Sequence, residues 1–81
     1  MSLSKYIARL QRMDYLIALK ATGPPDDFAC KLRLSRSTLF ETLQEMKNMG
    51  VDIRYSNTRA SYYYADERRI IIRIERMGEN R

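Results

Sequence analysis

The stretch that decides the fold is residues 25–40, PDDFACKLRLSRSTLF. It opens with a proline and two acidic residues, which suit a first helical turn because proline presets φ and carboxylates favour the positive end of the helix dipole. Three apolar side chains then share one face: Phe28, Ala29 and Leu32. This pattern predicts a short helix over residues 25–32. Ser35 is a good N-cap for another helix, so the stretch predicts two helices joined by a tight turn.

The second of these helices is expected to run over residues 36–49, with Gly50 at its C-terminal cap. Its apolar stripe is predicted to bury Leu39, Leu43 and Met46, and Met49 is also expected in the core. The same spacing turns a mostly polar set of side chains outward, with Thr38 at the margin: Arg36, Ser37, Phe40, Glu41, Gln44, Lys47 and Asn48. An exposed polar helix face is therefore expected directly after the tight turn.

Residues 3–21 predict an amphipathic helix that is capped by Ser2 or Ser4 and ends before Gly23. Its apolar stripe steps by three or four residues: Leu3, Tyr6, Ile7, Leu10, Met13, Ile17 and Ala21. Three basic residues share another face of the same helix: Lys5, Arg9 and Arg12. Three helices are thus expected before Gly50, where the spacing of the apolar residues changes.

After Gly50 the apolar period shortens to two, because Val51, Ile53 and Tyr55 alternate with polar residues. A polar loop at residues 56–60 separates this predicted strand from a tyrosine-rich one at residues 61–65. Two such runs joined by a five-residue loop predict an antiparallel hairpin.

Residues 68–76 are predicted as a third antiparallel strand, since Ile70, Ile72 and Ile74 alternate with Arg69, Ile71, Arg73 and Glu75. A short helix is the alternative, because three consecutive isoleucines do not decide the period. Within the hairpin, Tyr62, Tyr63 and Tyr64 suggest either stacking on single-stranded bases or packing of the hairpin against the core. Packing is favoured because tyrosine suits half-buried strands. Cys30 is expected to be a small interior side chain.

Composition limits the possible functions. The 81 residues are 44% apolar and 31% charged, which fits one globular domain over residues 1–76 with a frayed tail at 77–81. The chain has no histidine and one cysteine, which excludes imidazole catalysis, a His-ligated metal and an internal disulfide. No nucleophile lies beside a base, so no enzymatic activity, cofactor or small-molecule substrate is expected. Neither a signal peptide nor an apolar run of membrane length is present, so a soluble cytoplasmic protein with no membrane partner is expected.

The order of helix, short helix, tight turn, helix and hairpin resembles the winged helix-turn-helix domains of the biotin-repressor-like and deoxyribonucleoside-repressor-like transcription regulators. Residues 13–65 carry the resemblance. The family has Ala-x-x-Leu-Gly-Val-Ser-x-x-Thr-Val at the helix-turn-helix, and this chain matches it at Ala29, Leu32, Ser35 and Thr38. Leu34 and Leu39 replace the two valines, and Arg33 stands where the family has a turn glycine. The resemblance implies an α+β fold whose hairpin is the wing.

The resemblance also implies double-stranded DNA binding through the third helix and the wing. Ser35 and Ser37 are expected at phosphate, Arg36 at phosphate or guanine, and Gln44 at a base edge. The remaining expected contacts lie on the same helix and on the hairpin: Thr38, Phe40, Glu41, Lys47, Arg54 and Arg59. Phe40 stands where the family often has tyrosine and can touch a thymine methyl, Glu41 can accept from cytosine, and Arg59 is placed at the wing tip.

Fifteen basic against ten acidic residues leave a net charge of +5, which favours polyanionic partners. The surplus lies outside the third helix, because Arg36 and Lys47 there are balanced by Glu41 and Glu45. A neutral helix with an exposed Phe40 also suits the alternative function, a winged helix that binds another protein instead of DNA. Because one winged helix contacts few base pairs, a homodimer is expected, joined through the first helix or the strand at Ile70–Ile74.

Overall fold

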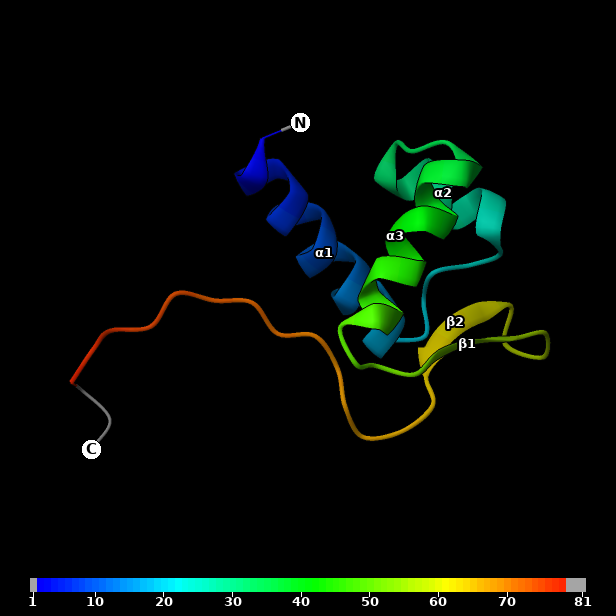
Figure 1. Cartoon of the computed structure of the whole chain (residues 1–81). Helices are drawn as coiled ribbons and strands as arrows, with labels where there is room; N and C mark the ends of the chain where they lie inside the picture. Colours follow the sequence, from blue (N-terminus) through cyan, green and yellow to red (C-terminus); the bar gives the residue numbers. More distant parts are fainter. Residues whose placement is uncertain (1, 79–81) are drawn as a thin grey trace.

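The computed structural model describes residues 2–78 and contains three helices followed by a two-stranded antiparallel sheet (Figure 1). The helices are α1 (Leu3–Ala18), α2 (Pro25–Leu32) and α3 (Arg36–Asn48). The strands β1 (Ile53–Ser56) and β2 (Ser61–Tyr64) pair in a register that places Ile53 opposite Tyr64 and Ser56 opposite Ser61. The fold is therefore α+β, as predicted, and its layout is compatible with a winged helix.

The predicted helix boundaries hold closely because local capping signals set them. Ser2 caps α1, and its side chain accepts from the backbone N–H of Lys5. Ser35 caps α3 by accepting from the N–H of Thr38 at 3.2 Å. At the other end of α1, the helix stops at Ala18, before the predicted end, because Lys20 already adopts a left-handed conformation with φ 56°.

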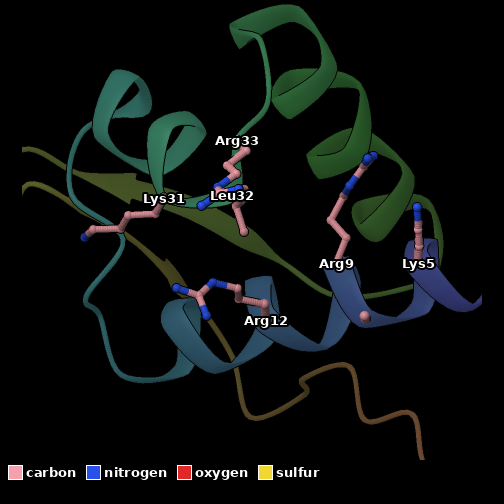
Figure 2. Close-up of a pocket in the computed structure, with 7 residues that line it drawn as sticks. Lys5, Arg9, Arg12, Lys31, Leu32 and Arg33 are labelled. Carbon is pink, nitrogen blue, oxygen red and sulfur yellow. The ribbon is translucent and has the colours of Figure 1, made fainter.

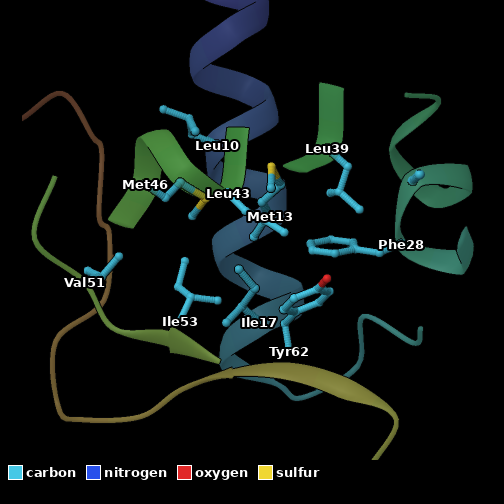
Figure 3. Close-up of a cluster of buried hydrophobic side chains, with 11 residues drawn as sticks. Leu10, Met13, Ile17, Phe28, Leu39, Leu43, Met46, Val51, Ile53 and Tyr62 are labelled. Carbon is cyan, nitrogen blue, oxygen red and sulfur yellow. The ribbon is translucent and has the colours of Figure 1, made fainter. Parts of the chain in front are cut away.

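The core is one cluster formed by all three helices and both strands (Figure 3). The predicted stripes supply most of it: Leu10, Met13 and Ile17 from α1, Phe28 and Ala29 from α2, and Leu39, Leu43 and Met46 from α3. Val51, Ile53 and Tyr62 close it from the hairpin side. The ring of Tyr62 lies 5.7 Å from that of Phe28 and 5.0 Å from that of Tyr55, so the favoured packing role of this tyrosine is confirmed.

The prediction of a third strand is wrong, and so is its helical alternative. Residues 68–76 are extended but have no strand partner among residues 2–78, where the sheet consists of β1 and β2. Ile70 and Ile72 pack against the core, and the side-chain amide of Gln11 donates to the carbonyl of Ile72 at 2.6 Å. The alternating pattern thus reflects one apolar side of an extended segment held against α1.

Two predictions for single side chains are also wrong. Cys30 is exposed, because the short α2 buries the face of Phe28 and Ala29, and Cys30 lies beyond its edge. Met49 is exposed because α3 ends at Asn48, so that the stripe of Leu39, Leu43 and Met46 does not extend to it. The proposed tail at 77–81 lies partly outside the described residues, since 79–81 are not among them.

Candidate nucleic-acid interface

The tight turn before α3 is formed by Arg33 and Leu34. Arg33 adopts the left-handed conformation, with φ 58° and ψ 44°. Its N–H donates to the carbonyl of Cys30 at 3.1 Å, and the N–H of Leu34 donates to that of Ala29 at 2.9 Å. These bonds close the C-terminus of α2 and direct the chain into the cap of α3.

The first turn of α3 brings together the hydroxyl residues expected at phosphate. Besides accepting from the N–H of Thr38, the Ser35 hydroxyl lies 3.0 Å from the hydroxyl of Thr38 and 3.4 Å from that of Ser37. The Ser35 hydroxyl is therefore engaged within the helix start, whereas Ser37 is exposed. A helix start of this kind presents backbone N–H groups and short polar side chains to an incoming anion.

Arg36 lies beside both a carboxylate and an aromatic ring. Its Nε is 3.2 Å from Oδ1 of Asp26 on α2, and its guanidinium lies 5.4 Å from the centre of the Phe40 ring. The Arg36 and Asp26 side chains are 59% and 74% exposed, and such surface pairs contribute only about 0–1 kcal/mol. Arg36 can therefore exchange Asp26 for a phosphate or a base at small cost.

The exposed face of α3 contains the other predicted contacts on this helix. Phe40 is 41% exposed, and Glu41, Gln44 and Lys47 are exposed as well. The side-chain amide of Gln44 donates to Asn48 at 3.1 Å, which holds it along the helix surface. The structure thus brings the α3 residues of the predicted site onto one outward face.

The two arginines of the hairpin lie apart from that face. Arg54 on β1 donates to both carboxylate oxygens of Asp52, at 3.1 and 3.0 Å, and this hydrogen bonding raises the pKa of Arg54. Arg59 lies in the turn between the strands, where its N–H donates to the Ser56 hydroxyl, and its side chain lines a shallow hollow with Lys20 and Tyr63. Within residues 2–78, no hydrogen bond or ion pair joins either arginine to α3.

A group of cations that the predicted site did not include gathers between α1 and the end of α2. These cations line a hollow of about 520 Å³, which Ala8 and Leu32 also line (Figure 2). The cations are Lys5, Arg9, Arg12, Lys31 and Arg33. We call this site the basic hollow. The shared helical face of Lys5, Arg9 and Arg12 was visible in the sequence. Their approach to Lys31 and Arg33 was not, because it depends on how α1 packs against α2.

Among residues 2–78, no three acidic or cysteine side chains come close enough to hold a metal ion. No helix in that part of the chain has the length and apolar character needed to cross a bilayer. Comparison with protein-family models, with curated proteins and with solved structures finds no match to this chain.

Proposed function

We propose that this protein binds double-stranded DNA in a sequence-specific manner through α3 and the β1–β2 hairpin, as a small cytoplasmic transcription regulator of bacterial type. The hairpin acts as the wing of a winged helix-turn-helix domain. The order of the elements and the left-handed turn at Arg33 support the resemblance to the biotin-repressor-like and deoxyribonucleoside-repressor-like regulators.

The observation that carries this proposal is the outward face of α3. Its opposite face is anchored in the core by Leu39, Leu43 and Met46, so the helix is held rigidly while its polar side remains open. An α-helix presented in this way fits the major groove of B-DNA, where base pairs offer distinct donor and acceptor patterns. Gln44 suits adenine, Arg36 suits guanine or phosphate, and Phe40 suits a thymine methyl.

Binding strength and sequence preference come from different residues in this proposal. Arg36 and Gln44 contact base edges, whereas Arg59 at the turn of the hairpin grips phosphate or enters the minor groove. Lys47 and Arg54 add backbone contacts. A homodimer doubles the number of base pairs contacted, as helix-turn-helix proteins commonly do.

The test compares substitutions in a DNA selection from a random pool, followed by fluorescence anisotropy on the selected duplex. Arg36→Ala and Gln44→Ala should change the preferred sequence, with about 1–3 kcal/mol lost on the selected site. Arg59→Ala should weaken binding to all duplexes alike. Arg68→Ala is the matched control, because Arg68 also forms an exposed ion pair, with Asp66, but lies outside the interface. If Arg36→Ala, Gln44→Ala and Arg59→Ala all bind as the wild type does, the proposal is wrong.

A second candidate function is docking on a partner protein, which the exposed Phe40 on the charge-neutral α3 favours. The two functions differ in their dependence on salt. A phosphate-driven binder loses affinity steeply with salt, by a log–log slope of about 0.9 for each phosphate neutralised. Absence of binding to any duplex at low salt would favour protein docking. The partner protein should then bind the Phe40→Ala variant more weakly than it binds the wild type.

A further inference from the structure

The basic hollow lies between α1 and the end of α2 and differs in charge from the rest of the surface. Five cationic side chains line it, and no carboxylate does. Elsewhere in residues 2–78, five arginines lie beside acidic partners: Arg36 with Asp26, Arg54 with Asp52, Arg68 with Asp66, Arg69 with Asp14, and Arg73 with Glu75. Within the same described range, no cation of the basic hollow forms an ion pair. The hollow is therefore a concentrated site of uncompensated positive charge.

The few contacts made by these cations leave the charge available. Lys31 donates to the backbone carbonyls of Ala21 and Thr22, at 2.9 and 3.1 Å, and Arg9 lies 6.0 Å from the centre of the Tyr6 ring. Neither contact neutralises a cation. Four of the five lining cations are exposed, and Arg9 is half-buried, so the hollow is an open surface (Figure 2).

The arrangement of the cations suits a polymer with repeated negative charges. Lys5, Arg9 and Arg12 occupy positions i, i+4 and i+7 of α1, which places them in a row about 10 Å long. One strand of B-DNA carries a phosphate about every 3.4 Å of helix axis, so such a row faces about three phosphates. An isolated small anion would instead need donors that converge on one enclosed point. An open row favours a nucleic-acid backbone.

A carboxylate of α3 lies against α1, the helix that carries three cations of the basic hollow. The hydroxyl of Tyr6 on α1 donates to the Glu45 carboxylate, which shows that α1 meets α3 on the Glu45 side. Glu45 repels a phosphate backbone at this contact between the two helices. The row of cations on α1 therefore suits a stretch of backbone of its own.

We propose that the basic hollow is a second nucleic-acid site, which binds the phosphate backbone of duplex DNA without regard to sequence. One molecule can then hold one duplex at α3 and another at the hollow. This site does not depend on the function proposed for α3, because it uses none of the α3 residues.

The test is a two-duplex capture assay with the full chain. One duplex is fixed to beads, protein is added, and retention of a second, fluorescent duplex of unrelated sequence is measured. Arg9→Gln with Arg12→Gln removes two charges from the hollow, and Lys20→Gln removes an exposed charge at the end of α1, outside the hollow, as the control. We expect the hollow variant to lose capture of the second duplex by about tenfold or more, while it binds the fixed duplex as the wild type does. The control variant should behave as the wild type does.

Three results would overturn the proposal. Undiminished capture by the hollow variant would mean that the two duplexes are held by other surfaces, such as the two α3 faces of a dimer. Equal loss of the fixed and the second duplex would mean that the hollow grips the same DNA as α3, provided that Arg36→Ala with Gln44→Ala also weakens binding to the fixed duplex. Hollow-dependent binding to phosphatidylserine vesicles without capture of DNA would assign the site to a membrane surface.

A further variant separates this proposal from the function proposed for α3. Arg36→Ala with Gln44→Ala removes the base-reading side chains but leaves the hollow intact. If α3 does not bind DNA, the wild type and this variant will show the same sequence-independent duplex binding, and Arg9→Gln with Arg12→Gln will abolish it. If the hollow does not bind DNA, sequence-specific binding will persist in the hollow variant and capture will be unchanged.

Discussion

At the scale of single residues, Arg33 shows how the turn before α3 tolerates an unfavourable backbone conformation. A side chain with a Cβ in the left-handed region costs about 1 kcal/mol relative to glycine. The two backbone hydrogen bonds at this turn, from the N–H groups of Arg33 and Leu34, require that conformation and offset the cost. The side chain of Arg33 also lines the basic hollow, which gives a reason for its presence there.

Arg33→Gly should therefore stabilise the fold. We expect the free energy of unfolding to rise by about 0.5–1 kcal/mol in urea denaturation, because glycine adopts φ 58° without strain. Arg33→Ala is the control, since it removes the same charge but keeps the Cβ and should bring no such gain. Equal stability of the glycine and alanine variants would contradict this explanation.

The buried carboxylate of Asp14 connects α1 to the chain beyond the hairpin. Asp14 is 7% exposed and accepts from the Tyr64 hydroxyl at 2.7 Å and from the Arg69 guanidinium at 3.1 and 2.5 Å. Burial first, and then the hydrogen bond to Asp14, raises the pKa of Tyr64 well above its usual value. The folded state therefore holds the Tyr64 proton more tightly than the unfolded chain does.

This raised pKa predicts a loss of stability in alkaline solution. Above about pH 10 the unfolded chain releases the Tyr64 proton while the folded protein retains it, so the free energy of unfolding falls as the pH rises. Urea denaturation at a series of alkaline pH values should show this fall, with a shallower slope for Tyr64→Phe. Part of the slope should remain in that variant, because burial also raises the pKa of Tyr62. The same slope in both proteins would show that Tyr64 does not contribute.

At the scale of elements, the loop between α1 and α2 is tied to β2 by two buried hydroxyl residues. The N–H of Thr22 donates to the Ser61 hydroxyl at 3.1 Å, and the N–H of Tyr62 donates to the Thr22 hydroxyl at 2.9 Å. Both Thr22 and Ser61 are almost completely buried. Thr22 thus supplies the bond that a further strand would otherwise give to Tyr62, and it fixes the hairpin against the helices.

Thr22→Val should loosen this connection while preserving the shape of the side chain. The N–H of Tyr62 would then be buried without a partner, which costs about 1–3 kcal/mol. Thermal or urea unfolding should show this loss, whereas Thr58→Val in the exposed turn should leave stability close to that of the wild type. A stability for Thr22→Val equal to that of Thr58→Val would exclude a structural role for the Thr22 hydroxyl.

The elements could be predicted where their signals are local. Ser35 caps α3 by accepting from the N–H of Thr38, only three residues along the chain. The alternation of apolar and polar residues after Gly50 marks the hairpin. The outward face of α3 follows from helical spacing in the same way. The prediction of a strand at residues 68–76 is wrong, because alternation does not show whether the backbone has a partner, and of its apolar side only Ile70 and Ile72 pack against the core, whereas Ile74 is exposed. The basic hollow escaped prediction because Arg9 and Arg33 meet only when α1 packs against α2.

At the scale of the whole molecule, the segment after the hairpin leaves apolar surface exposed. Ile71, Ile74 and Met77 are 62%, 101% and 95% exposed, and within residues 2–78 the segment has no strand partner. Antiparallel pairing of two copies centred on Ile72 would place Ile70 of each copy opposite Ile74 of the other. We propose that the homodimer forms through this pairing, which is self-complementary as a two-fold interface requires.

Sedimentation equilibrium provides the test of this dimer. The wild type should sediment as a dimer at micromolar concentrations, and Ile74→Asp should yield a monomer because it places two carboxylates in the seam. Leu19→Asp is the matched control, since Leu19 is also an exposed large apolar residue but lies at the end of α1. A wild type that remains monomeric at high micromolar concentration would remove the proposal.

The exposed side chain of Cys30 makes this protein well suited to fluorescence labelling. The chain has one cysteine, and its thiol is accessible on the surface of α2. A maleimide dye would therefore attach at one known position without any substitution. Because Cys30 directly precedes Lys31, the dye would lie next to the basic hollow, where its emission should change when a duplex arrives.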